Sequence, residues 1–207
     1  MMNPWKQVPL DVYEGHMQLD TVGQLQALDA LYRQRLSAYR VKSVAFWGIA
    51  GGNGLSHIKP AAYDAVYGVD INEAYLDACR SRYPALHEKL TLICADLSRS
   101  VTLPYAELVF ADLLIEYIDL AAFAARISAT IPRTLCCTIQ QNLAQSFVSP
   151  SPYAGQLLGI GGLHMDIEAC ALTDCVGAIG YRLCCREDIP LVNGKQLIRL
   201  DYMLEPD

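Results

Sequence analysis

The stretch Ser43-Val-Ala-Phe-Trp47-Gly-Ile-Ala-Gly-Gly-Asn-Gly54 decides the fold of this 207-residue chain. The first five residues predict a buried strand, and the glycine-rich segment after them predicts a turn. Glycine permits positive φ angles and lets a ligand approach the backbone closely. A strand that ends in such a turn indicates a nucleotide-binding α/β sheet. The alternative is a plain glycine-rich turn that binds no ligand.

Strands and helices alternate from Val41 onward. Strands are predicted at residues 43–47, 65–69, 90–94, 108–111 and 134–139. A short helix is predicted just before Pro60, which ends it, and longer helices are predicted at 73–83 and 119–130. A helix at 166–179 follows, ended by Gly180, and strands at 182–189 and 196–204 flank Asn193-Gly194, a hairpin signal. This order predicts a doubly wound, mostly parallel seven-stranded α/β sheet of the Rossmann-like type, with an antiparallel hairpin at its C-terminal end.

The N-terminal segment has a different character. Residues 22–39 place apolar side chains at helical spacing, whereas residues 4–20 show little helical or strand pattern. This irregular arm is nevertheless too apolar for a free tail, so we expect it to cover the carboxyl edge of the sheet as a lid. The chain is thus divided into an arm and helix (1–40) and the main domain (41–207). Residues 141–165, rich in Ser, Pro and Gly, are expected to be a long connection.

Composition narrows the possible partners and location. The net charge is −6, with 16 Lys+Arg and no basic run, which disfavours nucleic acid and favours a small-molecule partner. No apolar run approaches the ~18 residues that a membrane span needs, and the start lacks a secretory pattern, so a cytoplasmic location without a membrane is expected. The eight cysteines form no Cys-x-x-Cys and no zinc-like spacing; we expect buried, reduced thiols and no metal site.

The spacing of the glycines tests other nucleotide-binding motifs. No register gives G-x-G-x-x-G and no G-x-x-x-x-G-K-[ST] occurs, so NAD and ATP are disfavoured. Asp70, Asp96 and Asp112 follow the second, third and fourth predicted strands, where the edge of an α/β sheet binds ligands. A single Asp after a strand is often a turn or cap residue, but three in succession indicate a nucleoside site.

Residues 41–140 resemble the class I S-adenosylmethionine-dependent methyltransferase family, of the small bacterial type, and the terminal hairpin matches its last two strands. Gly48 and Gly52 match the outer glycines of its first motif, Ala50 replaces the middle one, Asn53 follows, and Phe46 stands where an acid is usual. The resemblance implies S-adenosylmethionine as cofactor and S-adenosylhomocysteine as product. It also implies Asp70 with Ile71 at the ribose, Asp96 with Leu97 at the adenine, and Asp112 with Leu113 at the methionine end.

Methyl transfer needs an in-line arrangement and the exclusion of water, with a base only if the acceptor must lose a proton. Glu116 and Tyr117, after the fourth strand, and Tyr13 and His16, in the arm, are the candidate catalytic residues. The alternatives are a solvated carboxylate for Glu116, core packing for Tyr117 and an exposed position for His16. Gln140, Gln141 and Tyr153 are further candidates for facing a substrate. The sequence predicts a methyltransferase acting on an unidentified small-molecule acceptor. The alternative is a regulatory module that binds an adenosyl ligand without catalysis.

Overall fold

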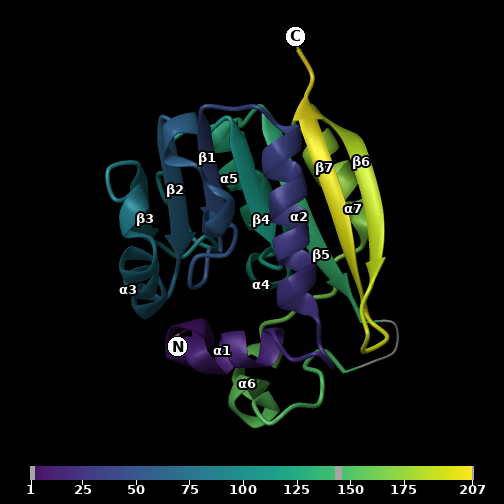
Figure 1. Ribbon diagram of the computed structural model, residues 1–207. Helices are drawn as coiled ribbons and strands as arrows, with labels where there is room; N and C mark the ends of the chain where they lie inside the picture. The colour runs from purple at the N-terminus through teal and green to yellow at the C-terminus, as the bar shows by residue number, and fades with distance from the viewer. Residues whose placement is uncertain (1–2, 143–145, 207) are drawn as a thin grey trace.

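The sheet has the strand order β3-β2-β1-β4-β5-β7-β6, as the computed structural model of residues 3–142 and 146–206 shows (Figure 1). The strands are β1 Ser43–Trp47, β2 Ala65–Asp70, β3 Leu90–Cys94, β4 Leu108–Asp112, β5 Thr134–Gln141, β6 Tyr181–Pro190 and β7 Gln196–Leu204. The first five strands pair in parallel, and β7 pairs antiparallel with both β5 and β6. The predicted doubly wound sheet with its antiparallel hairpin is confirmed.

Strand order reverses between β1 and β4. From β1 the chain continues to β2 and β3 on one side, whereas β4, β5 and the hairpin lie on the other. The loops that leave the carboxyl ends of β1 and β4 therefore diverge, and such a divergence creates a crevice in doubly wound sheets. This edge of the sheet is the place to look for a ligand.

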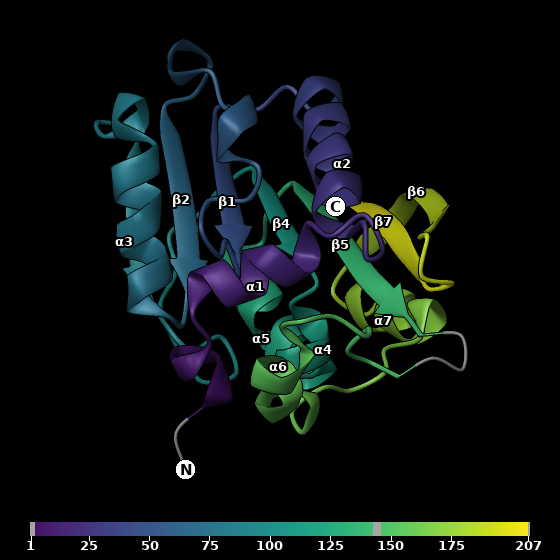
Figure 2. The same ribbon diagram turned by 60° about the horizontal axis from the view of Figure 1, so that its bottom comes forward.

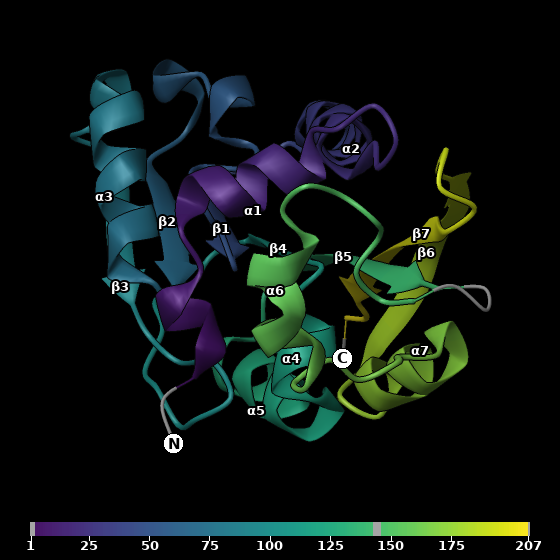
Figure 3. The ribbon, with the colours of Figure 1, turned by 90° about the horizontal axis from the view of Figure 1, so that it is seen from below.

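Helices cover both faces of the sheet (Figures 1 and 3). Helices α2 (Gln24–Ala38) and α3 (Glu73–Arg82) lie on one face, and α5 (Leu120–Thr130) and α7 (Ala169–Gly177) on the other. Under α2, Phe46 stacks on Phe110 with ring centroids 5.1 Å apart, and Tyr32 packs edge-on against both rings. An aromatic stack therefore includes Phe46, at the position that follows the centre of β1.

Two helices lie beneath the carboxyl edge of the sheet (Figure 2). They are α1 (Leu10–Met17), preceded by the 3-10 turn η1 (Pro4–Gln7), and α6 (Ala154–Gly161). The prediction of an irregular arm over residues 4–20 was wrong, because Val8 and Val12 pack against Leu157 and Ile160 of α6 in a small separate core. Tertiary contacts thus stabilise a helix whose sequence pattern is weak. Helix α6 likewise interrupts the expected connection at 141–165, of which residues 143–145 lie outside the described part.

The remaining helical elements are short. They are η2 (Leu55–His57), the short helix predicted before Pro60, η3 (Pro60–Ala62), η4 (Pro84–Leu86) and α4 (Ile115–Ile118). Helix α4 was not predicted, and it carries the segment that follows β4 beneath the sheet. In residues 3–142 and 146–206, no helix combines the length and apolar character that crossing a membrane requires.

All eight cysteines are free thiols. Cys79, Cys136 and Cys137 are buried, as expected, but Cys94 and Cys184 are exposed, and so is Cys170. For Cys94 and Cys184 the expectation of burial fails because β3 and β6 are the outer strands of the sheet, where one side chain in two can face solvent, and Cys170 lies on the exposed side of α7.

Candidate active site

A cavity of about 630 Å³ lies at the carboxyl ends of the first four strands. Eight of the residues expected at the cofactor line it: Gly48, Ala50, Asp70, Ile71, Asp96, Leu97, Asp112 and Leu113. Trp5 and Tyr13 from the N-terminal segment and Tyr75 from α3 complete one wall. The structure therefore assembles most of the predicted nucleoside site from four loops and the arm.

Asp70 fixes the glycine-rich turn. Its Oδ2 accepts a hydrogen bond from the Ala50 N–H at 2.9 Å, and its Oδ1 accepts one from the Asn72 N–H, also at 2.9 Å. Ala50 has a φ of 50°, a left-handed conformation that costs a non-glycine residue about 1–2 kcal/mol. Burial raises the pKa of the Asp70 carboxyl, while the backbone donors oppose that rise. Each carboxylate oxygen keeps a second lone pair for a ligand in the cavity.

Gly52 and Asn53, also predicted at the cofactor, do not line this cavity. The N–H groups of both donate to the Ile49 carbonyl, so the turn folds back away from the cavity. They line a separate depression beside Glu14 and Arg82, whose side chains form an ion pair over the turn. The sequence motif contains these residues, but only its first half faces the crevice.

Asp96 and Asp112 both line the cavity, but their side chains have different partners. Asp96 is only partly buried, and its Oδ1 caps the following turn by accepting from the Ser98 N–H at 3.0 Å. Asp112 is buried, and its Oδ1 lies 2.9 Å from Nη1 of Arg35. Its Oδ2 is buried and has no hydrogen-bond partner in the described residues. Oδ1 of Asp112 is therefore paired with Arg35, and the side chains of Thr138 and Tyr32 also lie close enough to the carboxyl to lower its pKa.

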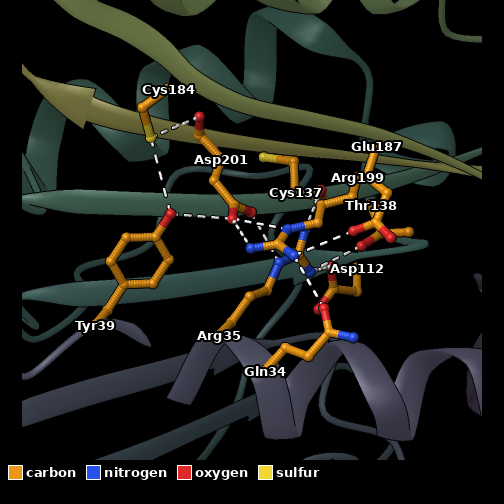
Figure 4. A network of polar contacts seen from close by, with 10 residues as sticks. All are labelled: Gln34, Arg35, Tyr39, Asp112, Cys137, Thr138, Cys184, Glu187, Arg199 and Asp201. Carbon is orange, nitrogen blue, oxygen red and sulfur yellow. Dashed lines mark hydrogen bonds and ion pairs between the residues drawn. The ribbon is translucent and has the colours of Figure 1, made fainter. Parts of the chain in front are cut away.

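Arg35 of α2 is the centre of a buried polar network (Figure 4). Its guanidinium contacts Asp112 and, through Nε at 2.8 Å, Asp201 of β7, and it donates to the Cys137 carbonyl at 2.8 Å and to Thr138 Oγ1 at 2.9 Å. Asp201 in turn accepts from Arg199 Nη2 at 2.6 Å. Arg35 and Asp201 are both fully buried. Burial raises the pKa of Asp112, and the Arg35 charge opposes this rise.

A second cavity of about 530 Å³ adjoins the first. The two share four lining residues: Trp5, Tyr13, Leu113 and Tyr117. Leu113 has a φ of 52°, so the chain turns sharply from β4 into α4 at the boundary between the cavities. Left-handed conformations of non-glycine residues are often found at functional sites. All four candidate catalytic residues, Glu116, Tyr117, Tyr13 and His16, line this second cavity.

Glu116 is the most unusual group in the second cavity. Its side chain is buried, with 1% of the residue exposed, so the alternative of a solvated carboxylate was wrong. The Gln140 N–H donates to Oε1 at 2.8 Å, whereas Oε2 is buried and without a partner in the described residues. Burial raises the pKa of the Glu116 carboxyl to about 7.

The other three candidates are neutral near pH 7. His16 is buried rather than exposed, its Nδ1 lies 2.8 Å from Ser151 Oγ, and burial lowers its pKa. Burial raises the pKa of both Tyr13 and Tyr117, so their phenols stay protonated. We therefore expect these side chains to act through contacts, and Glu116 to be the group that exchanges a proton.

The structure also corrects and extends the set of residues facing an acceptor. Gln140 lines the second cavity, whereas Gln141 hydrogen-bonds to Gln196 and Tyr153 packs against Gly15 of α1. Sequence reasoning missed His164 in this cavity; its Nε2 is buried without a partner in the described part of the chain, and burial lowers its pKa. In the same part of the chain, no group of three or more His, Cys, Asp or Glu side chains is placed to hold a metal ion.

No protein-family model and no curated protein sequence matches this chain. Solved structures do match. Magnesium protoporphyrin IX methyltransferase (ChlM) from Synechocystis PCC 6803, with bound SAH, has a TM-score of 0.68 and 16% identity over 97% of this chain and 96% of that chain. The N-methyltransferase NodS from Bradyrhizobium japonicum WM9, in complex with S-adenosyl-L-homocysteine, has a TM-score of 0.69 and 11% identity over 99% and 100%.

The chain has the fold of the class I methyltransferases. The [4+2]-cyclase SpnF shares it too, with a TM-score of 0.63 and 12% identity over 87% of this chain and 82% of that chain. At these identities the likeness concerns the fold alone. The reaction must be argued from the two cavities and the groups that line them.

Proposed function

We propose that this protein transfers a methyl group from S-adenosylmethionine to a small molecule bound in the second cavity. The observation that carries the proposal is the pair of adjoining cavities that meet at Leu113 and Tyr117, directly below the point where strand order reverses. One cavity has the predicted nucleoside-binding residues, and the other has a buried carboxylate and aromatic walls.

The residues of the first cavity fit this cofactor. The unpartnered Oδ2 of Asp112 suits an amino-acid ammonium, and the spare lone pairs of Asp70 suit ribose hydroxyls. The cofactor supplies an electrophilic methyl group next to a sulfonium. The protein must then hold the acceptor in line with that group and keep water out, and the aromatic side chains shared by the two cavities serve both purposes.

Isothermal titration tests the cofactor assignment. S-Adenosylhomocysteine is expected to bind with a dissociation constant of about 1 μM, equivalent to about −8 kcal/mol, and NAD not to bind. The Asp70→Ala variant should bind about 1.5–3 kcal/mol more weakly, because hydrogen bonds to a charged group are lost. Asp77→Ala, at an exposed position on α3, is the matched control. Tight binding of NAD and none of the adenosyl ligand would refute the proposal.

We also propose that η1 and α1 form a lid over the first cavity. Asn72 Nδ2 donates to the Trp5 carbonyl at 2.9 Å, Glu14 pairs with Arg82, and His16 contacts Ser151, so polar contacts join the segment to both ends of α3 and to the residues before α6. The apolar contacts of Val8 and Val12 with α6 belong to a small core that is separate from the larger cores on the two faces of the sheet. A segment of this kind can open without unfolding the sheet.

Hydrogen exchange on residues 4–20, with and without S-adenosylhomocysteine, measures the opening of this lid. Exchange is expected to slow on ligand binding, because the ligand closes the cavity that Trp5 and Tyr13 line. Amides in β4, whose residues are all buried, serve as the internal reference and should change little. Equal protection of residues 4–20 in both states would identify a permanent structural cover instead.

A further inference from the structure

Glu116 has the only side chain that is formally charged at neutral pH among the described residues lining the second cavity. The two histidines there, His16 and His164, have lowered pKa values and are neutral. Asp166 lies near His164, at 3.9 Å, but its side chain is exposed. Lys195 is a buried cation close to the cavity: its Nζ donates to the Phe147 carbonyl and lies 5.9 Å from the centroid of the Phe147 ring, and in addition to burial its charge contributes to the lowered pKa of both histidines. A buried carboxylate without a counter-ion is costly, so the cavity suits a ligand that brings a positive charge.

The walls of this cavity suit the same kind of ligand. Trp5 meets Tyr117 edge-on at 4.9 Å between ring centroids, and Tyr117 meets Phe147 at 6.0 Å. The ring planes are 89° and 72° apart, and Phe147 also stacks on His164 with ring centroids 3.8 Å apart, so the aromatic side chains pack on one another along this wall. Aromatic faces attract organic cations and also pack against apolar groups.

We propose that the acceptor is an organic amine with an apolar or aromatic body, bound as its ammonium ion by Oε2 of Glu116. This inference rests on the proposed function and specifies the substrate class for it. Leu157 and Ile160 of α6 offer apolar surface for the body of the molecule. An anionic acceptor would face the Glu116 carboxylate, while the buried Lys195 is already bound to the Phe147 carbonyl, and a hydroxyl brings no positive charge to Glu116.

The reaction then balances as follows. The Glu116 carboxylate takes one proton from the ammonium, which frees the nitrogen lone pair. Nitrogen forms a bond to the methyl carbon as the carbon–sulfur bond breaks and its electron pair returns to sulfur. The positive charge therefore moves from sulfur to nitrogen while Glu116 is neutral, and it pairs with the Glu116 carboxylate once that group has released its proton. Loss of the proton from Glu116 to solvent restores the carboxylate and completes the products: an N-methylammonium, S-adenosylhomocysteine and H⁺.

Three probes of similar size separate the acceptor classes: 2-phenylethylamine, 2-phenylethanol and 3-phenylpropanoate. Each is titrated calorimetrically into protein saturated with S-adenosylhomocysteine at about pH 8.5, where Glu116 is ionised. The amine is expected to bind on the order of tenfold more tightly than the alcohol, and the carboxylate most weakly. In the Glu116→Gln variant the difference between amine and alcohol should disappear, while Glu88→Gln, an exposed position, should keep it.

The wild-type protein alone gives a second measurement, should the variant fold poorly. Amine binding should weaken between about pH 8.5 and pH 6, as Glu116 is protonated, whereas alcohol binding should stay constant. Equal or tighter binding of the alcohol or the carboxylate, or no binding of the amine, overturns the inference. Failure to bind S-adenosylhomocysteine refutes the proposed function instead, and the amine preference is then measured on the free protein.

Discussion

The Arg35→Met variant is expected to lose about 3–5 kcal/mol of unfolding free energy, the usual cost of removing one partner of a buried ion pair. Methionine fills most of the same space, but it leaves Asp112 and Asp201 as buried carboxylates. Urea unfolding followed by circular dichroism measures the loss. Since a native domain is stable by only about 5–15 kcal/mol, the variant is brought close to unfolding.

The matched control for this variant is Arg80→Met. Arg80 pairs with Asp77 on the exposed surface of α3, where ion pairs contribute about 0–1 kcal/mol. The double variant Arg35→Met/Asp201→Asn should recover part of the lost unfolding free energy, because it removes one of the two buried carboxylates that Arg35→Met leaves without a partner. A loss below about 1 kcal/mol for Arg35→Met would mean that water or other groups replace the guanidinium, against the network described here.

Glu116→Gln is expected to lower kcat by about 10²–10⁴-fold, the usual contribution of a general base, with S-adenosylhomocysteine affinity unchanged. The wild-type rate should rise with pH and level off above about pH 7, because the ionised carboxylate takes the proton. The variant should lack this dependence. An unchanged kcat or an identical pH profile would exclude Glu116 as the base.

The same substitution should increase stability in alkaline solution. The folded pKa of about 7 lies above the ordinary value of 4.5, so the protonated form stabilises the fold below about pH 4.5. That contribution is lost as the pH rises through about 7, and the difference corresponds to about 3 kcal/mol. Glu116→Gln cannot ionise, and it should therefore unfold at higher urea concentration than wild type at pH 8.5 but not at pH 4.5. Loss of rate with gain of stability is not expected of a merely structural residue.

The sequence predicted the sheet well because its strands have local signals. The bounds of β1, β3 and β7 were predicted to the residue, since β1 and β3 are largely apolar runs limited by turn or charged residues and β7 follows the Asn193-Gly194 hairpin signal. Asp70, Asp96 and Asp112 could be placed in one cavity because the carboxyl ends of parallel strands meet at one edge. The positions of these three aspartates follow from the topology of the sheet alone.

The remaining parts of the site depend on contacts between distant segments. Helix α1 has a weak pattern of its own and is stabilised by α6, and Gly52 leaves the cavity because of a local turn that the motif does not specify. Arg35 was counted only as a helix residue, because its partners lie 77 and 166 positions further along the chain. A polar residue on the buried side of an amphipathic helix was the one local signal of its role.

The position of Asp201 also sets the order in which the protein can mature during synthesis. Arg35 can meet Asp112 and the backbone of β5 as soon as those segments leave the ribosome, but Asp201 is supplied much later, in β7. Until then the guanidinium lacks one of its two carboxylate partners, and the antiparallel strand that covers it is missing. In a nascent chain with β1 to β5 in place, the buried polar network around Arg35 is therefore incomplete. Its second carboxylate joins only when translation has passed the final hairpin.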